Sequence, residues 1–213
     1  FGADGAWGEW VRRWTAEEGR HATAIRDYLT VTRAIDPVAL ERGRMAQMSG
    51  GEVPQPPNAA AGMLYVTMQE LATRISHRNT GKLLEGVDRA GYDIMRRVAI
   101  DENFHFLFYR DIATAGFEVD PSQMMIALEP QVTDFAMPGT GIPDFAAHSK
   151  LIASAGIYDL INHYHYYQYN QEPLQGSEPQ LGVLEDQEDL AVHQEELQEP
   201  LQEPLQEPHQ EPH

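Results

Sequence analysis

The sequence of 213 residues contains no cysteine, which excludes disulfides, thiolate metal sites and cysteine catalysis. It also lacks an apolar stretch near the roughly 18–20 residues that a membrane-spanning helix needs. The best run, residues 59–68, is short and includes Thr67. The first residues show no basic segment followed by an apolar one, as a signal peptide would. We therefore expect a cytoplasmic protein without a membrane span.

Positive charge is scarce as well, with 15 Lys and Arg against 33 Asp and Glu and a net charge of −18. Residues 171–213 hold 12 of the acidic side chains and no Lys or Arg, which leaves 21 acidic and 15 basic residues in 1–170. Such a balance argues against a protein that mainly binds nucleic acid or anionic lipid. We expect no nucleic-acid partner.

The C-terminal part differs in composition from the rest. Residues 161–213 comprise an aromatic connector and a low-complexity tail that ends in LQEPLQEPLQEPHQEPH. Each proline removes a helical hydrogen bond, and the tail has too little apolar surface to offset the entropy of ordering it. We predict a folded domain over 1–160 and a disordered or non-native tail over 161–213. His163 and His165 are interpreted as part of the connector rather than as metal ligands.

Six segments are rich in helix formers and carry apolar residues three and four positions apart, as amphipathic helices do. They cover residues 6–34, 37–48, 58–84, 88–115, 120–135 and 144–160. Capping and turn residues such as Asp36-Pro37 and Gly116 mark their limits. No segment of the body alternates polar and apolar residues as a strand does. The pattern predicts an all-α protein in which long antiparallel helices pack as a bundle.

Two Glu-x-x-His units lie inside predicted long helices, Glu18 to His21 and Glu102 to His105. Positions three apart share one helix face, so a carboxylate and an imidazole can reach the same ion. A single such unit is usually a solvated pair. Two units together with Glu70 on a third helix supply five of the six ligands of a di-iron carboxylate bundle. Carboxylates and imidazoles suit iron, and cations relieve the repulsion between buried carboxylates.

Three stretches carry a resemblance to a known family: WTAEEGRH at 14–21, QELATRISHRNTGK at 69–82 and DENFH at 101–105. They resemble the signature segments of soluble acyl-acyl carrier protein (acyl-ACP) desaturases, most closely the mycobacterial type. The resemblance implies a ferritin-like bundle with two iron ions. It also implies an O2-dependent enzyme of fatty acid biosynthesis that introduces a cis double bond into a carrier-bound fatty acyl chain. The expected partners are an acyl carrier protein with its acyl substrate, a ferredoxin-type electron donor and a second copy in a homodimer.

Taken position by position, the resemblance assigns roles to seven residues. Thr73 matches a threonine near the oxygen-binding side, and Asp101 matches an acid that orients a ligand histidine. The residues that match iron ligands are Glu18, His21, Glu70, Glu102 and His105.

The chain departs from the family pattern at three points, one of which is the sequence from about Asn162 onward, which does not resemble the continuing helices of the family. The remaining glutamate ligand is expected on a helix upstream of Phe1, so we expect the N-terminal helices of the bundle to be missing; Glu9 lies on the same helix as Glu18 and does not replace it. Asn103 and Phe104 stand where the family commonly has a basic pair. These departures leave two alternatives open: a non-catalytic ferritin-like paralogue, and a di-iron oxidase or iron-binding protein.

Two further groups of residues are weaker candidates. A basic stripe on the third predicted helix is interpreted first as a solvated face and second, with four other arginines, as a docking patch for an acidic carrier protein. Its residues are Arg74, Arg78 and Lys82, and the other arginines are Arg12, Arg13, Arg96 and Arg97. An acyl tunnel is expected along Met63, Met68, Tyr92 and Met95.

Overall fold

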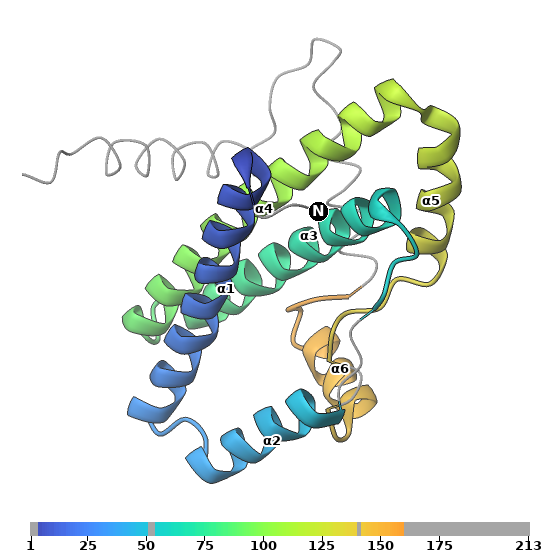
Figure 1. Cartoon of the computed structure of the whole chain (residues 1–213). Coiled ribbons are helices and arrows are strands. Elements are labelled where there is room, and N and C mark those ends of the chain that lie inside the picture. The colour runs from blue at the N-terminus through green and yellow to red at the C-terminus, as the bar shows by residue number, and fades with distance from the viewer. Residues whose placement is uncertain (1–3, 51–53, 140–141, 160–213) are drawn as a thin grey trace, which may run out of the picture. The chain divides into compact units, whose positions relative to one another are not determined.

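The computed structural model describes residues 4–50, 54–139 and 142–159, all within the first of two units, 1–170 and 171–213. The described residues form six helices and no strand (Figure 1), so the all-α prediction is confirmed. The helices are α1 (Gly5–Val31), α2 (Pro37–Gly50), α3 (Ala59–Leu84), α4 (Arg89–Val119), α5 (Pro121–Thr133) and α6 (Phe145–Ser154). The tail with His163 and His165 lies outside the described residues, and the boundary near residue 160 stays a prediction.

Short polar side chains start the helices where the sequence predicts them. Asn58 accepts a hydrogen bond from the Ala61 backbone N–H, Asp88 from that of Gly91, and Asp120 from that of Gln123. Such caps satisfy backbone donors that have no partner within the helix. The three capped helices, α3, α4 and α5, form most of the core.

The helix ends that differ most from the prediction are those of α4 and α6. Helix α4 continues through Gly116 to Val119, because Gly116 is a contact residue rather than a C-cap: a Cβ there would meet Met124 Sδ at 2.9 Å. Its lack of a side chain lets α5 pack close to α4. Helix α6 ends at Ser154 rather than near residue 160, and Gly156 follows in a left-handed conformation with φ of 70°.

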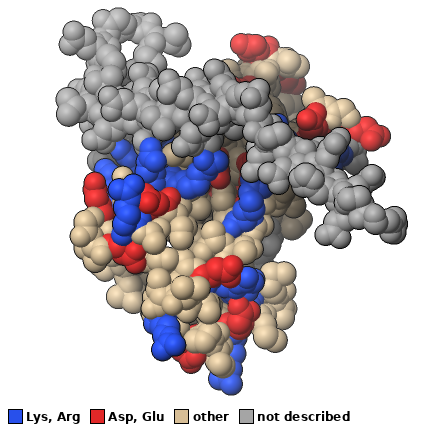
Figure 2. All heavy atoms as spheres, turned by 90° about the vertical axis from the view of Figure 1, so that its left-hand side faces the viewer, with Lys and Arg blue, Asp and Glu red and all other residues tan. Residues whose placement is uncertain are grey.

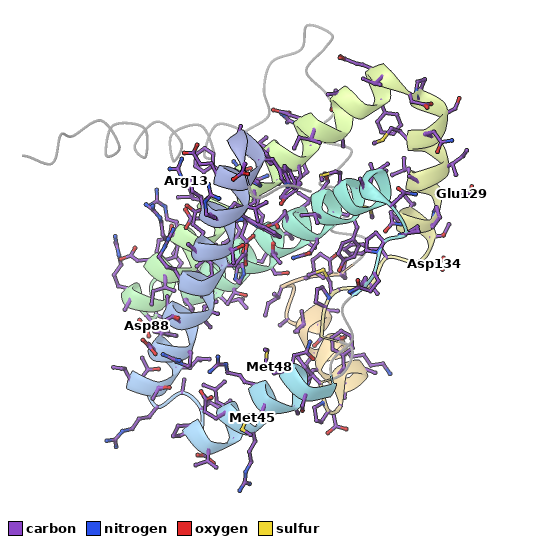
Figure 3. All side chains as sticks on the ribbon, viewed as in Figure 1. Arg13, Met45, Met48, Asp88, Glu129 and Asp134 are labelled. Atoms are coloured by element: carbon purple, nitrogen blue, oxygen red, sulfur yellow. The ribbon has the colours of Figure 1, made fainter. Side chains whose placement is uncertain are left out.

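Helices α3 and α4 form the central antiparallel hairpin (Figure 1). One apolar cluster in this hairpin contains Leu71, Ile75 and Phe106. A second cluster adds residues of α5 and contains Ala61, Leu64, Ala113, Met124 and Ala127. Helices α2 and α6 contribute no buried residue, and Met45 and Met48 of α2 are exposed (Figure 3). The rigid core is therefore the α3–α4 hairpin.

Helix α1 runs alongside α4 in the opposite direction. At one end, Tyr28 donates a hydrogen bond of 2.8 Å to Asp88 Oδ2. At the other, the Trp10 ring stacks on Phe108 with centroids 3.7 Å apart, and Trp10 Nε1 donates to Tyr109 Oη over 3.3 Å. These contacts fix the register of α1 against α4. They also place the middle of α1 over the α3–α4 hairpin.

Among the described residues, no helix combines the length and the apolar character that crossing a bilayer requires.

The contact between α1 and the start of α4 leaves no room at Gly91. A Cβ at this position would lie 2.5 Å from Tyr28 Oη and 2.8 Å from Leu84 Cδ1, whereas a Cβ at Gly62 would meet no atom within 4 Å. We predict that Gly91→Ala lowers the free energy of unfolding by roughly 1–3 kcal/mol through overpacking. The control Gly62→Ala should raise it by about 0.5–1 kcal/mol through helix propensity.

Urea unfolding followed by circular dichroism measures both variants. Equal effects of the two substitutions would contradict the close packing of α1 on α4.

Candidate metal centre

Three helices bring acidic side chains and one imidazole to a common point. Ligand atoms of Glu18 on α1, Glu70 on α3, and Glu102 and His105 on α4 all lie within 4.8 Å of one another. Glu70, Glu102 and His105 are buried, whereas the side chain of Glu18 is 39% exposed. The cluster therefore lies in the protein interior and is most open on the α1 side.

The histidines of the two Glu-x-x-His units are held by acids from the opposite helix. Asp101 Oδ2 lies 3.0 Å from His21 Nε2, and Glu17 Oε2 lies 2.9 Å from His105 Nε2. An ionised carboxylate only accepts hydrogen bonds, so each Nε2 carries the hydrogen and each Nδ1 is left as the coordinating atom. Acids placed in this way fix the tautomer and the orientation of metal-binding histidines.

Both Nδ1 atoms point into the carboxylate cluster. His21 Nδ1 lies 3.3 Å from Glu102 Oε1 and 3.9 Å from Glu18 Oε2. His105 Nδ1 lies 3.2 Å from Glu18 Oε1 and 3.6 Å from Glu102 Oε2. The two oxygens of Glu18 thus face different imidazoles, and so do the two oxygens of Glu102. Each of these two carboxylates therefore lies between the two imidazoles.

The cluster is short of hydrogen-bond partners. Among the described residues, five buried side-chain polar atoms lack a partner, and four of them belong here: Glu18 Oε1, His21 Nδ1, Glu70 Oε2 and His105 Nδ1. Unpaired buried polar atoms are rare and costly. All four are lone-pair donors of the kind that first-row divalent metals accept. The residues present therefore fit a metal site.

Side chains around the cluster contact its carboxylates. Trp14 Nε1 donates to Glu70 Oε1 over 3.2 Å, and Thr73 Oγ1 lies at hydrogen-bond distance, 3.0 Å, from Glu102 Oε2. His77 Nε2 lies 3.7 Å from Glu102 Oε1. The rings of Trp10 and Trp14 contact His105 edge-on. These contacts restrict both the rotation of the ligand side chains and the access of water.

The pKa values show how the metal-free cluster balances its charge. Burial alone lowers the pKa of both histidines. For His21, the nearby carboxylates of Asp101 and Glu102 outweigh burial and raise the pKa to about 9. For His105, the four surrounding glutamate carboxylates outweigh burial and raise the pKa to about 12. Burial raises the pKa of Glu70 to about 8. Protons thus occupy the cluster near neutral pH and supply positive charge that a metal would otherwise provide.

The structure brings together the residues that the sequence singled out. Glu18, Glu70, Glu102 and His105 form the cluster with His21 beside it, while Thr73 and Asp101 contact its members directly. Their roles as iron ligands and supporting residues remain predictions. Glu9 is exposed, in keeping with the expectation that it is not a ligand.

Three residues of the site were missed from the sequence: Glu17, Trp14 and His77. A signal existed for Glu17, because an acid directly precedes the glutamate in both motifs, Glu17 before Glu18 and Asp101 before Glu102. No local pattern identifies Trp14 or His77, because their contacts with Glu70 and Glu102 depend on how the helices pack.

The basic stripe on α3 is not a uniform solvated face, so that interpretation is wrong for Arg74. Arg74 is only 7% exposed because it lies beside Leu71 and Ile75, which pack in the core. Arg78 is half-buried and Lys82 is exposed. The expected tunnel along Met63, Met68, Tyr92 and Met95 stays a prediction.

Comparisons with known proteins agree with this geometry. The sequence profile described as fatty acid desaturase matches residues 2–169. The chain belongs to the fatty acid desaturase family. It is 46% identical over 167 residues to DesA1 of Mycobacterium tuberculosis, whose name includes acyl-ACP desaturase. The alignment covers 75% of this chain and 49% of DesA1. It is 33% identical over 172 residues to the chloroplastic stearoyl-ACP 9-desaturase of Gossypium hirsutum, covering 74% and 43%.

A solved structure supports the fold. The X-ray structure of DesA2 from Mycobacterium tuberculosis, titled as an acyl-ACP desaturase, matches with a TM-score of 0.62 and 28% identity. The match covers 78% of this chain and 67% of that one. The predicted ferritin-like fold and the family resemblance are thereby confirmed. The chain spans about half the length of the curated relatives it matches.

Protons and metal ions compete for the same atoms, so metal binding should depend on pH. Raising the pH toward about 9 removes the proton from His21, and passing about 8 removes it from Glu70. We predict that Co2+ affinity increases from about pH 6 to about pH 9 and that binding releases protons. Calorimetric titration in buffers of different ionisation enthalpy measures both quantities. A pH-independent affinity without proton release would contradict binding at the Nδ1 atoms.

Proposed function

We propose that this chain contributes the di-iron centre of an acyl-ACP desaturase, which introduces a cis double bond into a carrier-bound saturated fatty acyl chain. One observation carries the proposal. Two antiparallel Glu-x-x-His units hold their histidines through acids of the opposite helix and direct unpaired Nδ1 and carboxylate atoms to one buried point. The names of DesA1 and of the Gossypium hirsutum protein both include acyl-ACP desaturase, which supports the reaction class.

The arrangement of the ligand atoms favours two ions over one. His105 and Glu70 would hold one ion and His21 the other, with Glu18 and Glu102 between them. On the His105 side, Glu70 supplies a carboxylate that belongs to that side alone. The described residues include no equivalent carboxylate on the His21 side. The family resemblance implies one further glutamate ligand, which this side of the cluster would need.

The protein's own residues prepare the site for oxidation of an unreactive carbon–hydrogen bond. Bound iron would supply the O2 activation and hydrogen abstraction that no acidic or basic side chain can perform. Glu17 and Asp101 keep the Nε2 hydrogens in place, and Trp14 restrains Glu70. The Thr73 hydroxyl faces Glu102, where it can donate or accept a proton beside the ligands.

The proposed partners follow from this reaction. An acyl carrier protein would deliver the acyl chain, a ferredoxin-type protein would supply electrons, and a second copy would form the expected homodimer. Carrier proteins and ferredoxins of acidic character need positive charge to dock. On the face of the protein that Figure 2 shows, several Lys and Arg side chains lie near one another. Exposed arginines on α1 and α4 include Arg12, Arg13 and Arg97.

A desaturation assay tests the proposal. Iron-loaded full chain is incubated with O2, reduced ferredoxin and acyl-ACP substrates of several chain lengths, and the fatty acids are analysed by mass spectrometry. A product two hydrogens lighter than its substrate is expected for at least one chain length. Iron-loaded protein that desaturates no chain length would contradict the enzyme assignment. Iron oxidation without acyl product would favour an oxidase or iron-binding protein, and absence of stoichiometric iron would favour a non-catalytic paralogue.

The contact between Thr73 and Glu102 predicts a specific effect of a threonine substitution. Thr73→Val removes a hydroxyl next to a ligand carboxylate and should lower desaturation turnover by about 10-fold, the lower end of effects seen when partners of metal ligands are lost. The matched control is Thr67→Val on the same helix, because Thr67 bonds to the Met63 backbone oxygen and not to the cluster. It should stay within about twofold of wild type.

Turnover is measured per bound iron, so that metal loss and catalytic loss are separated. Equal losses in the two variants would contradict a role for Thr73 at the centre.

A further inference from the structure

The two ligand motifs share the order acid, Glu, x, x, His, but the residue before the histidine is charged in one and apolar in the other. On α1 the motif reads Glu17-Glu18-Gly19-Arg20-His21, and on α4 it reads Asp101-Glu102-Asn103-Phe104-His105. In the α1 motif, Arg20 Nη2 lies 3.2 Å from Glu17 Oε1, while Glu17 Oε2 holds His105. The equivalent position on α4 is Phe104, whose side chain carries no positive charge.

Arg97 supplies to Asp101 the positive charge that Phe104 cannot supply. It lies one helical turn before Asp101, and its Nε is 3.4 Å from Asp101 Oδ1. The other oxygen, Oδ2, lies 3.0 Å from His21 Nε2. Each supporting carboxylate is therefore held in the same manner, with one oxygen on an arginine and the other on a histidine. The sequence of groups is Arg20–Glu17–His105 on one side and Arg97–Asp101–His21 on the other.

We propose that Arg97 is a positioning residue for His21, and that it supplies through Asp101 the support that Arg20 supplies to His105 through Glu17. A carboxylate with both oxygens engaged cannot rotate freely about its terminal torsion, so the hydrogen bond to the imidazole keeps its direction. The side chains of Arg97 and Arg20 are 54% and 64% exposed, whereas Asp101 is 14% exposed. Each series of three groups thus runs from a solvent-exposed arginine through one partly buried carboxylate to a histidine of the proposed centre.

This inference rests on the proposed metal centre. It predicts that the His21 side and the His105 side of that centre can be altered independently. Because the supporting groups differ, removal of Arg97 should affect His21 alone, and removal of Arg20 should affect His105 alone. A general loss of helix stability would affect both imidazoles together. The selectivity of the effect is therefore the quantity to measure.

The test uses the full chain with 15N-labelled histidine. Nuclear magnetic resonance reports the tautomer of each imidazole and the solvent exchange of its Nε2 hydrogen, in the metal-free and the Zn2+-loaded protein. The variants are Arg97→Gln, Arg97→Lys, Arg20→Gln, and Arg97→Gln combined with Phe104→Arg. Arg89→Gln is the matched control, because Arg89 forms an exposed ion pair of 2.7 Å with Asp93 on the same helix, away from the cluster.

Arg97→Gln should speed exchange of the His21 Nε2 hydrogen and weaken Zn2+ binding by about 10-fold, with His105 unchanged. Arg20→Gln should show the reverse selectivity. Arg97→Lys and the added Phe104→Arg should each restore His21 at least in part, and Arg89→Gln should behave as wild type.

An unchanged His21 resonance in Arg97→Gln, or equal changes at His21 and His105, would overturn the proposal. Failure of the wild-type chain to bind Zn2+ would instead contradict the metal centre. The metal-free comparison would then still decide whether Arg97 acts on His21.

Discussion

The structure depends on one constraint: both histidines have to present Nδ1 to a buried group of carboxylates. Here a carboxylate on each Nε2 fixes this orientation, and in each case the carboxylate comes from the opposite helix. Helices α1 and α4 must therefore run antiparallel in one register, with His21 opposite Asp101 and His105 opposite Glu17. The ring stacking of Trp10 on Phe108 and the bond from Tyr28 to Asp88 hold that register from either end.

The charge balance of the cluster follows from the same constraint. Burial raises the pKa of Glu70 and carboxylates raise the pKa of His21 and His105, so the metal-free site retains protons near neutral pH. A metal at this point would replace those protons with charge that does not depend on pH. Metal binding at this site would therefore release protons.

Local sequence was sufficient to predict the helices and most of the residues that form the cluster. Glu-x-x-His spacing places both side chains on one helix face whatever the rest of the fold, so Glu18, His21, Glu102 and His105 could be identified without a structure. Capping by Asn58, Asp88 and Asp120 is equally local.

Features that depend on packing between helices could not be predicted in this way. Glu17 supports His105 only because of the register between α1 and α4, and Arg74 is buried only because its neighbours on α3 face the core. Gly116 resembles a helix stop in sequence but serves as a contact point for Met124 of α5. The pair of Arg97 and Asp101 is local, four positions apart on α4, but the contact of Asp101 with His21 of α1 again depends on the register between the helices.

Anomalous diffraction at the iron absorption edge, from crystals of the iron-loaded chain, tests the central claim most directly. The account predicts iron between α1, α3 and α4, coordinated by His105 Nδ1 and oxygens of Glu18, Glu70 and Glu102, with a second ion beside His21 Nδ1. Iron bound elsewhere, or coordinated through either Nε2 atom, would contradict it.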